Sequence, residues 1–183
     1  MEYKVLKKQS YQSGKYSLIP IRIEDRFDIM KWRNEQLYHL RQKEPLTEAG
    51  QDAYFNNVVA KLFDEEKPGQ ILFSYLEGGK CIGYGGLVHI NWQDRNAEIS
   101  FVMDTALEKD YFELHWKQYI ALLEEVAFKD LQIHKIYTYA FDLRPHLYPI
   151  FESAGFYKEA ELQQHVLFEG EYKSVIIHAK IKN

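Results

Sequence analysis

Glu98 is the residue of this sequence best suited by type and position to transfer a proton. The expected strand over residues 97–103 alternates in character, so that Glu98 and Ser100 share one face. The apolar side chains of Ile99 and Phe101 then point to the opposite face. A carboxylate that faces a cleft accepts a proton directly or through a water molecule. The pattern also fits a solvated strand-edge charge or a salt bridge within the sheet, and the sequence leaves these alternatives open.

A second set of side chains suited to binding lies earlier, at Trp32-Arg33-Asn34, with Arg41 and Lys43 close behind. An aromatic plane stacks on a sugar or a nucleobase, and a guanidinium pairs with phosphate. The triplet therefore suits a ligand such as a nucleotide-linked amino sugar. The alternative is a helix end with Trp32 packed in the core and Arg33 exposed to solvent.

Metal and nucleophile chemistry is not expected. The seven histidines form no His-x-x-x-His pair and no cluster with cysteine, so no metal site is predicted. The single cysteine, Cys81, excludes an intrachain disulfide and lies in an apolar segment, where we expect a small buried side chain rather than a nucleophile. Neither a Gly-x-Ser-x-Gly motif nor a Walker loop is present.

Composition limits the classes of partner. The net charge of −4 and the pI of about 6.0 argue against nucleic acid as a ligand. No run approaches the ~18 apolar residues of a membrane span, and the polar start lacks a signal sequence. With its lone cysteine, the chain is expected to be cytoplasmic. We expect an N-terminal extension over residues 1–16 and a single domain over 17–183.

The elements that hold these residues follow from hydrophobic periodicity. Asp25 and Thr47 are expected to cap the first two helices. Gly78-Gly79 predicts a two-residue hairpin turn. Expected strands cover residues 17–24, 70–76, 80–90 and 97–103. After a further helix, the tail should form a strand near 134–137, a short helix over 144–153 and a hairpin over 162–180.

Several segments, in this order, resemble a known family. The segments are Trp32-Arg33-Asn34, Ala97-Glu98-Ile99-Ser100-Phe101, Ala154-Gly155-Phe156, and the hairpin from His165 to Tyr172. From Ser17 onward they resemble the GNAT superfamily of N-acetyltransferases, in particular its ribosomal-protein and amino-sugar branch. The resemblance implies an α+β fold in three layers. Its mixed, mostly antiparallel central sheet would have about seven strands and about four flanking helices.

The resemblance also implies a donor site. Members bind acetyl-CoA, as a co-substrate, where two neighbouring parallel strands separate and free backbone groups meet the pantetheine amides. In this sequence the two strands would be 97–103 and 136–141. The backbone of Phe101, Val102 and Met103 would then contact the cofactor.

The chain departs from the family at the pyrophosphate loop. The family has a glycine-rich loop here, whereas this chain has no glycine between Gly86 and Gly155. We expect Asp110 and Glu113 to form the capping pair of the following helix, which would oppose a phosphate. Lys109, or Lys117, is the expected replacement contact.

Two further departures lie in the last short helix. Arg144 stands where the family has Asn, and a guanidinium there can supply a phosphate contact. Phe151 stands where the family often has the Tyr that protonates the leaving thiolate. Tyr148, one turn earlier, is the expected substitute, although packing of its ring is an alternative.

The resemblance, with these residues, predicts acetyl transfer from acetyl-CoA to a primary amine of a small molecule. Glu98 would act as the base, Tyr148 or water as the acid, and Trp32, Arg33 and Asn34 would bind the acceptor. Lys109, Arg144 and Phe151 would join the three strand residues at the donor site. A different acyl donor is a further alternative. The rival hypothesis is a non-catalytic protein of this fold that binds a ligand or partner, and a homodimer is compatible with either.

Overall fold

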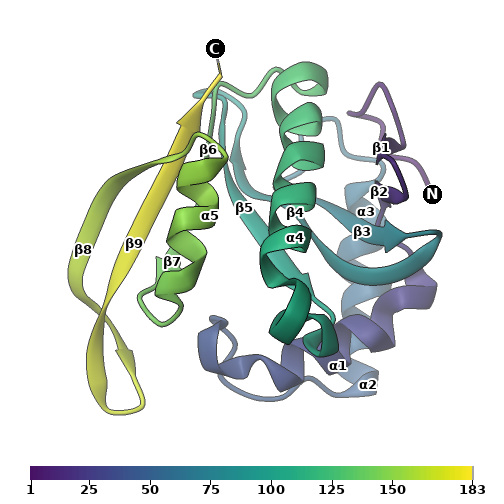
Figure 1. The fold of residues 1–183 in the computed structure, drawn as a ribbon. Coiled ribbons are helices and arrows are strands. Elements are labelled where there is room, and N and C mark those ends of the chain that lie inside the picture. The colour runs from purple at the N-terminus through teal and green to yellow at the C-terminus, as the bar shows by residue number, and fades with distance from the viewer. Residues whose placement is uncertain (183) are drawn as a thin grey trace.

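The computed structural model describes residues 1–182, which form one mixed sheet of nine strands (Figure 1). Its first half is an antiparallel series of five strands: β1 (Tyr11–Ser13), β2 (Tyr16–Pro20), β3 (Ile71–Glu77), β4 (Lys80–Asn91) and β5 (Asn96–Met103). The second half contains β6 (Lys135–Tyr137), β7 (Ala140–Phe141), β8 (Tyr157–Phe168) and β9 (Glu171–Ile181). Among the strand pairs of residues 1–182, only β5–β6 is parallel. The sheet exceeds the expected seven strands because β1 adds an edge and two short strands, β6 and β7, both pair with β9.

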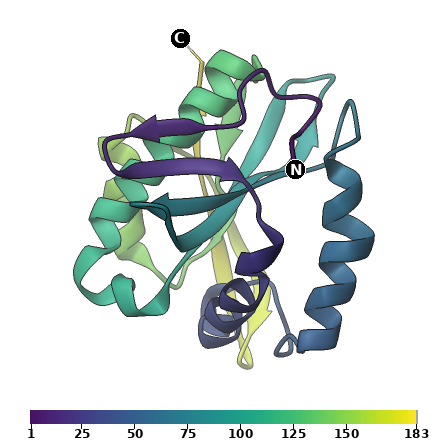
Figure 2. The same cartoon turned by 90° about the vertical axis from the view of Figure 1, so that its right-hand side faces the viewer.

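Four continuous helices within the described residues cover the sheet, in agreement with the expected number. They are α1 (Arg26–Glu35), α2 (Glu48–Tyr54) running through a π-helical turn into α3 (Ala60–Leu62), α4 (Thr105–Glu124) with a π-helical end, and α5 (Tyr148–Ser153). Figure 2 shows α4 on one side of the sheet and α2–α3 on the other. The Thr47 Oγ1 accepts from the Gly50 amide at 3.1 Å, which confirms the predicted N-cap of α2. The three layers are those of the expected fold.

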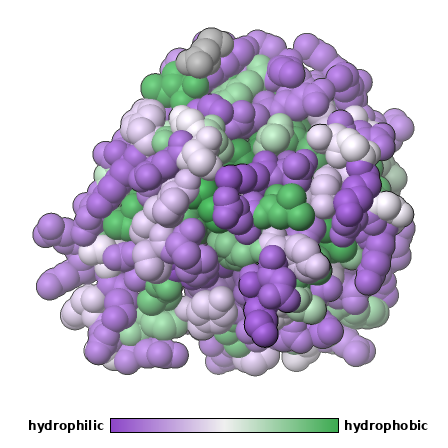
Figure 3. Space-filling view, viewed as in Figure 1, coloured by the Kyte–Doolittle hydropathy of each residue, from purple (hydrophilic) through white to green (hydrophobic). Residues whose placement is uncertain are grey.

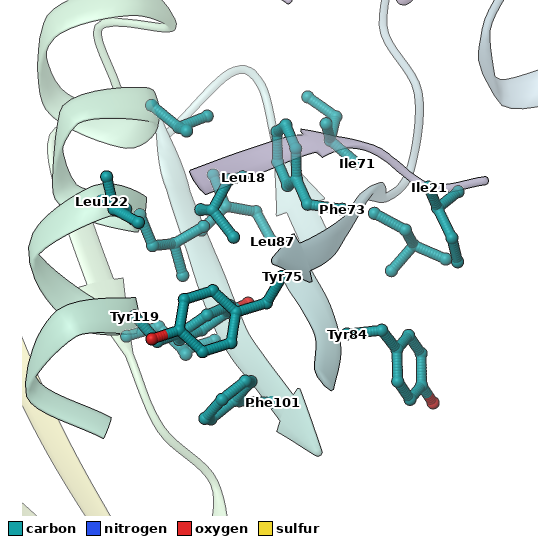
Figure 4. Packing of buried hydrophobic residues seen from close by; sticks show 14 of the residues in the cluster. Leu18, Ile21, Ile71, Phe73, Tyr75, Tyr84, Leu87, Phe101, Tyr119 and Leu122 are labelled. Carbon is teal, nitrogen blue, oxygen red and sulfur yellow. The ribbon is translucent and has the colours of Figure 1, made fainter. Parts of the chain in front are cut away.

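An aromatic cluster fixes α4 against the middle of the sheet (Figure 4). Tyr119 stacks on Phe101 with ring centroids 3.8 Å apart, and Tyr75 meets both rings edge-on. The Tyr119 hydroxyl donates to the Ser100 carbonyl oxygen at 2.7 Å. A Cβ on Gly85 would lie 2.6 Å from that hydroxyl, so glycine is required where β4 passes under it. The cluster holds β5 in place from one face.

Residues 1–16 are part of the packed structure and not an extension from it. Tyr3, Leu6 and Tyr11 are buried in the core. The Asp130 carboxylate, at the end of the helical segment after α4, accepts from the backbone amides of Lys7 and Lys8 at 3.1 and 3.0 Å and from the Tyr11 hydroxyl at 2.5 Å. The expected boundary at residue 16 therefore does not match the structure, because contacts distant in sequence bury this segment.

The start of α4 also differs from expectation. The helix begins at Thr105, directly after β5, and the Asp104 carboxylate caps it by accepting from the Ala106 amide at 3.1 Å. Asp110 and Glu113, expected as the capping pair, lie inside the helix, and Glu113 pairs with Lys117 at 2.6 Å. The segment expected as a phosphate loop is therefore helical.

Among residues 1–182, no helix is long and apolar enough to cross a bilayer. On the face in Figure 3, hydrophobic residues lie in small patches among hydrophilic ones.

Candidate active site

The two parallel strands of the sheet separate after a short paired stretch. β5 and β6 are in register only at Asn96–Lys135, Ala97–Ile136 and Glu98–Tyr137. β5 then continues to Met103, while β7 pairs with β9 alone in the described chain. A cavity of about 140 Å³ lies in this opening. Backbone groups of β5 that face it have lost their strand partner, so an extended ligand can pair with them.

The expected donor-site residues of β5 divide into two groups. Phe101 and Val102 line the opening. Met103 does not, and its carbonyl oxygen accepts from the buried side-chain amide of Gln36 at 2.8 Å. Trp116 of α4 also lines the opening, and its buried indole N–H has no acceptor within residues 1–182. An unpaired buried donor is costly, so this N–H suits a ligand carbonyl.

Glu98 lies where β5 and β6 part, and it faces the cavity. Its side chain is only 6% exposed. Arg41, from the loop after α1, pairs with one carboxylate oxygen, and His89 Nδ1 lies 2.8 Å from the other. Glu98 therefore combines two of the roles considered from the sequence: it forms salt bridges, and it also faces the cavity.

At the far end of the opening, Arg144 lines the cavity but is already paired. Its Nη1 lies 3.3 Å from Glu108 Oε1, and the two side chains are only 13% and 17% exposed. Burial lowers the pKa of Arg144 and raises that of Glu108, and each charge opposes the shift of the other. Lys109 lies apart from this pair, in a groove between α4 and α5 together with Lys117 and His146.

Tyr148 and Phe151, both on α5, have different positions. Phe151 lines the opening and is buried. Tyr148 is not among the residues that line it; its hydroxyl donates to Asp142 Oδ1 at 2.7 Å and its ring stacks on His178. Burial, followed by the bond to Asp142, raises the pKa of Tyr148 well above its usual value. The packing alternative therefore describes Tyr148 better than a role as acid.

The three residues at the end of α1 that were expected to bind the acceptor, Trp32, Arg33 and Asn34, have different surroundings. Trp32 is buried in the core. Asn34 clamps the following loop, accepting from the Leu46 amide at 2.7 Å and donating to the Leu46 carbonyl at 2.9 Å. Of the three residues, only Arg33 lines a cavity: it borders both the strand opening and a second cavity of about 310 Å³ between α1, α2 and the sheet.

The two cavities meet at Arg33, Val88 and Ser100, which line both. Ser100 was expected on the same face as Glu98, and it stands next to the point where the strands separate. One cavity therefore opens along β5 and the other reaches the same strand from the side of α1 and α2. This is the arrangement that a two-substrate reaction needs.

Two further residues line the opening, His39 and Tyr139, and the sequence analysis did not identify either. The His39 Nε2 lies 3.1 Å from Gln36 Oε1. Burial, and then the nearby Arg144 charge, lower the pKa of His39 to about 3, so the ring is neutral at physiological pH. Tyr139 packs its ring under the Arg41 guanidinium at 4.9 Å. His39 ends a 3-10 helical turn of only three residues (Leu37–His39), and Tyr139 lies in the link between β6 and β7, so neither segment is long enough for a periodic pattern.

No group of three or more His, Cys, Asp or Glu side chains within residues 1–182 is arranged to hold a metal ion. Burial raises the pKa of the Cys81 thiol to about 12, so this residue is no nucleophile at neutral pH. The residues that remain for chemistry are those of the strand opening.

The sheet opens between its parallel strands β5 and β6, with Glu98 at the point of separation, and this is the opening that the resemblance to N-acetyltransferases implies. Residues 19–176 match the family described as "Acetyltransferase (GNAT) domain". The chain belongs to this GNAT acetyltransferase family.

Solved structures with the same fold come from Vibrio cholerae. Its spermidine N-acetyltransferase in complex with CoA and spermine aligns with a TM-score of 0.78 at 17% identity, over 93% of this chain and 97% of that chain. A dodecameric structure of spermidine N-acetyltransferase from the same organism aligns with a TM-score of 0.75 at 18% identity, over 93% and 95%. No curated protein sequence matches the chain. At these identities the structural likeness shows the fold alone.

Proposed function

We propose that this chain transfers an acetyl group from acetyl-CoA to the primary amine of a small molecule. The observation that carries the proposal is the unpaired length of β5, with Phe101 and Val102 facing a cavity between separated parallel strands. An extended pantetheine arm fits there as an added strand would. The unpaired indole N–H of Trp116 supplies a donor for a carbonyl of that arm.

The residues at the phosphate end fit the co-substrate less simply. The α4 N-terminus carries partial positive charge, but Glu108 in its first turn opposes an anion. Arg144 can bind a phosphate only if its guanidinium first breaks the ion pair with Glu108. Lys109 and Lys117 line the groove between α4 and α5, but Asp110 and Glu113 line it too, and Glu113 pairs with Lys117.

In the proposed mechanism, the amine attacks without an acyl-enzyme intermediate. Glu98 accepts a proton from the ammonium group, directly or through water, because it is the carboxylate facing the cavity. Free backbone amides of β5 polarise the carbonyl. Since the Tyr148 hydroxyl is engaged by Asp142, we assign protonation of the leaving sulfur to water.

The charges favour an acceptor that carries an anionic group. Arg33 donates to two neutral oxygens, Gln42 Oε1 at 2.8 Å and the Tyr84 hydroxyl at 2.6 Å, and makes no ion pair within residues 1–182. No Asp or Glu is among the residues that line the 310 Å³ cavity. A polyamine would meet a cation there and find no free carboxylate. A phosphate- or nucleotide-linked amino sugar fits this site better.

Calorimetric titration with acetyl-CoA tests the proposed function. We expect saturable binding in the micromolar range, weaker for desulfo-CoA or dephospho-CoA. Absence of heat and of a thermal shift at millimolar acetyl-CoA would contradict an acetyltransferase and favour the non-catalytic alternative. Binding without acetylation of any amine in a screen would favour a ligand-binding role as well.

Glu108→Gln is expected to bind acetyl-CoA about tenfold more tightly, a change of about 1.4 kcal/mol. The substitution removes a carboxylate from the first turn of α4 and frees the Arg144 guanidinium for phosphate. Calorimetry measures the affinity. S-acetylpantetheine, which lacks the nucleotide and its phosphates, should bind wild type and variant equally.

The matched control is Glu66→Gln, which removes an exposed carboxylate in the loop after α3. It should leave the acetyl-CoA affinity unchanged. An unchanged or weaker affinity of the Glu108 variant would show that the phosphates do not approach the Glu108–Arg144 pair.

We also propose a homodimer that forms through the long β8–β9 hairpin, which extends along one side of the molecule (Figure 1). β8 pairs only with β9 in the described chain, so its outer edge is open. Leu167 and Tyr172 near the turn are 64% and 66% exposed. Sedimentation velocity at micromolar concentration should show a dimer that Leu167→Lys and Tyr172→Lys convert to monomer. A monomeric wild type would contradict the proposal.

A further inference from the structure

His89 lies at a break in the regular pairing of β4 with β5. The register shifts between Val88 and Asn91, and His89 has a φ of 49°. This left-handed conformation is uncommon for a residue other than glycine. Val88 pairs with Glu98 across the two strands, so regular alternation would turn His89 to the opposite face from Glu98. The bulge instead brings the imidazole back to the carboxylate.

The contact between His89 and Glu98 links an exposed imidazole to a buried carboxylate. His89 Nδ1 lies 2.8 Å from Glu98 Oε2, and the His89 side chain is 62% exposed whereas that of Glu98 is 6% exposed. The other charged and titratable groups around the carboxylate are Arg41, paired with its second oxygen, and Tyr137 of β6. Burial, and then the Glu98 charge, raise the pKa of Tyr137, so its hydroxyl stays protonated at neutral pH. His89 is therefore the neighbour that can exchange a proton with bulk water.

The reaction requires such an exchange. When an ammonium group becomes an amide, the nitrogen forms a bond to the acetyl carbon and loses two protons. The carbon–sulfur bond breaks, sulfur keeps its electron pair, and one proton ends on the thiol. The second proton must reach solvent in every turnover. Glu98 is enclosed by Arg41 and His89, so a proton that it accepts needs a route outward.

We propose that His89 is a positioning residue that orients the Glu98 carboxylate and carries its proton to solvent. The inference rests on the proposed function, because it assigns a partner to the same base. The bulge and the left-handed backbone at His89 serve to aim the imidazole at Glu98. Arg41 holds the other oxygen and keeps the carboxylate directed into the cavity.

His89→Asn tests the role. Asparagine tolerates a positive φ and can donate its amide N–H to Glu98, but it cannot carry a proton. We expect kcat to fall 10- to 30-fold with little change in either KM, and added imidazole to restore part of the rate. The acid side of the kcat–pH profile should also change. His134→Asn, an exposed histidine away from the opening, should behave as wild type.

The double variant His89→Asn, Glu98→Gln separates the proton route from a merely structural effect. If His89 acts through Glu98, the double variant should be no slower than Glu98→Gln alone. Wild-type kcat and pH profile in His89→Asn, or fully additive losses in the double variant, would overturn the proposal. Acetyl-CoA titration of the same proteins distinguishes failure of this proposal from failure of the proposed function. If His89→Asn binds acetyl-CoA and acetylates the acceptor as wild type does, the role of His89 is rejected and the proposed function stands.

Discussion

Glu98→Gln is expected to lower kcat about 10²- to 10³-fold, the effect of losing a general base. Glutamine keeps the shape of the side chain and can still accept from Arg41, but it cannot take a proton from the acceptor. Because Arg41 is partly exposed, its charge can be hydrated when the carboxylate is lost. We therefore expect the fold to persist, with a modest fall in thermal stability. The affinity for acetyl-CoA should change little.

The pH dependence distinguishes a base from a positioning group. A primary amine has a pKa near 10, as lysine does, so more of the acceptor is already unprotonated as the pH rises. The defect of Glu98→Gln should shrink between pH 7 and pH 10 when the rate is measured at saturating substrates. Glu77→Gln, which removes a carboxylate paired with Lys15 at the end of β3, is the matched control. A defect of constant size across this range would contradict proton transfer by Glu98.

Local pattern was sufficient to predict much of the sheet. The strands at 71–77, 80–91 and 96–103 lie within about two residues of expectation, because alternation and Gly78-Gly79 are both local signals. The N-terminal segment could not be placed in this way. Its burial depends on Asp130, more than a hundred residues away, and on backbone amides that carry no residue-type signal.

The first turn of α4 was mispredicted for a related reason. Asp104 and Asp110 both have the chemistry of an N-cap, and their sequence context does not separate them. The structure selects Asp104, which places Glu108 in the first turn, where it can reach Arg144. Glu108, one member of a charged pair, therefore lies in the segment that corresponds to the glycine-rich loop of the family, which this chain lacks.

The site was predictable to the extent that it follows strand alternation. Alternation predicted that Glu98 and Ser100 share one face of β5; both line the cavity, but so do Ile99 and Phe101 of the other face, because the cavity lies along the unpaired edge of the strand. Alternation could not predict the position of His89, because a bulge reverses the side of the sheet to which its side chain points. Trp32 and Asn34 have the right chemistry for a ligand but serve the fold, Trp32 in the core and Asn34 as a loop clamp. Residue type alone does not reveal that difference.

Arg33→Met is expected to raise KM for a phosphorylated amino-sugar acceptor about 100-fold, with kcat changed only a fewfold. The substitution removes two charge-assisted hydrogen bonds to the anion, each worth about 1.5–3 kcal/mol, and this is enough to account for a 100-fold rise in KM. Methionine retains most of the apolar length, and the partners left behind, Gln42 and Tyr84, are neutral. The acetyl-CoA affinity should stay the same, because Arg33 lies where the two cavities meet and not at the phosphate end of the donor site.

Three comparisons make this prediction specific to an anionic acceptor. Arg33→Lys should be intermediate, since it keeps the charge but not the planar fork that binds two phosphate oxygens. The same amino sugar without phosphate should show nearly equal KM values with wild type and Arg33→Met. Spermidine, repelled by Arg33, should be a poor acceptor for wild type and a better one for the methionine variant. Efficient acetylation of spermidine by wild type, with an acceptor KM insensitive to Arg33, would instead show that the 310 Å³ cavity does not select the acceptor by its charge.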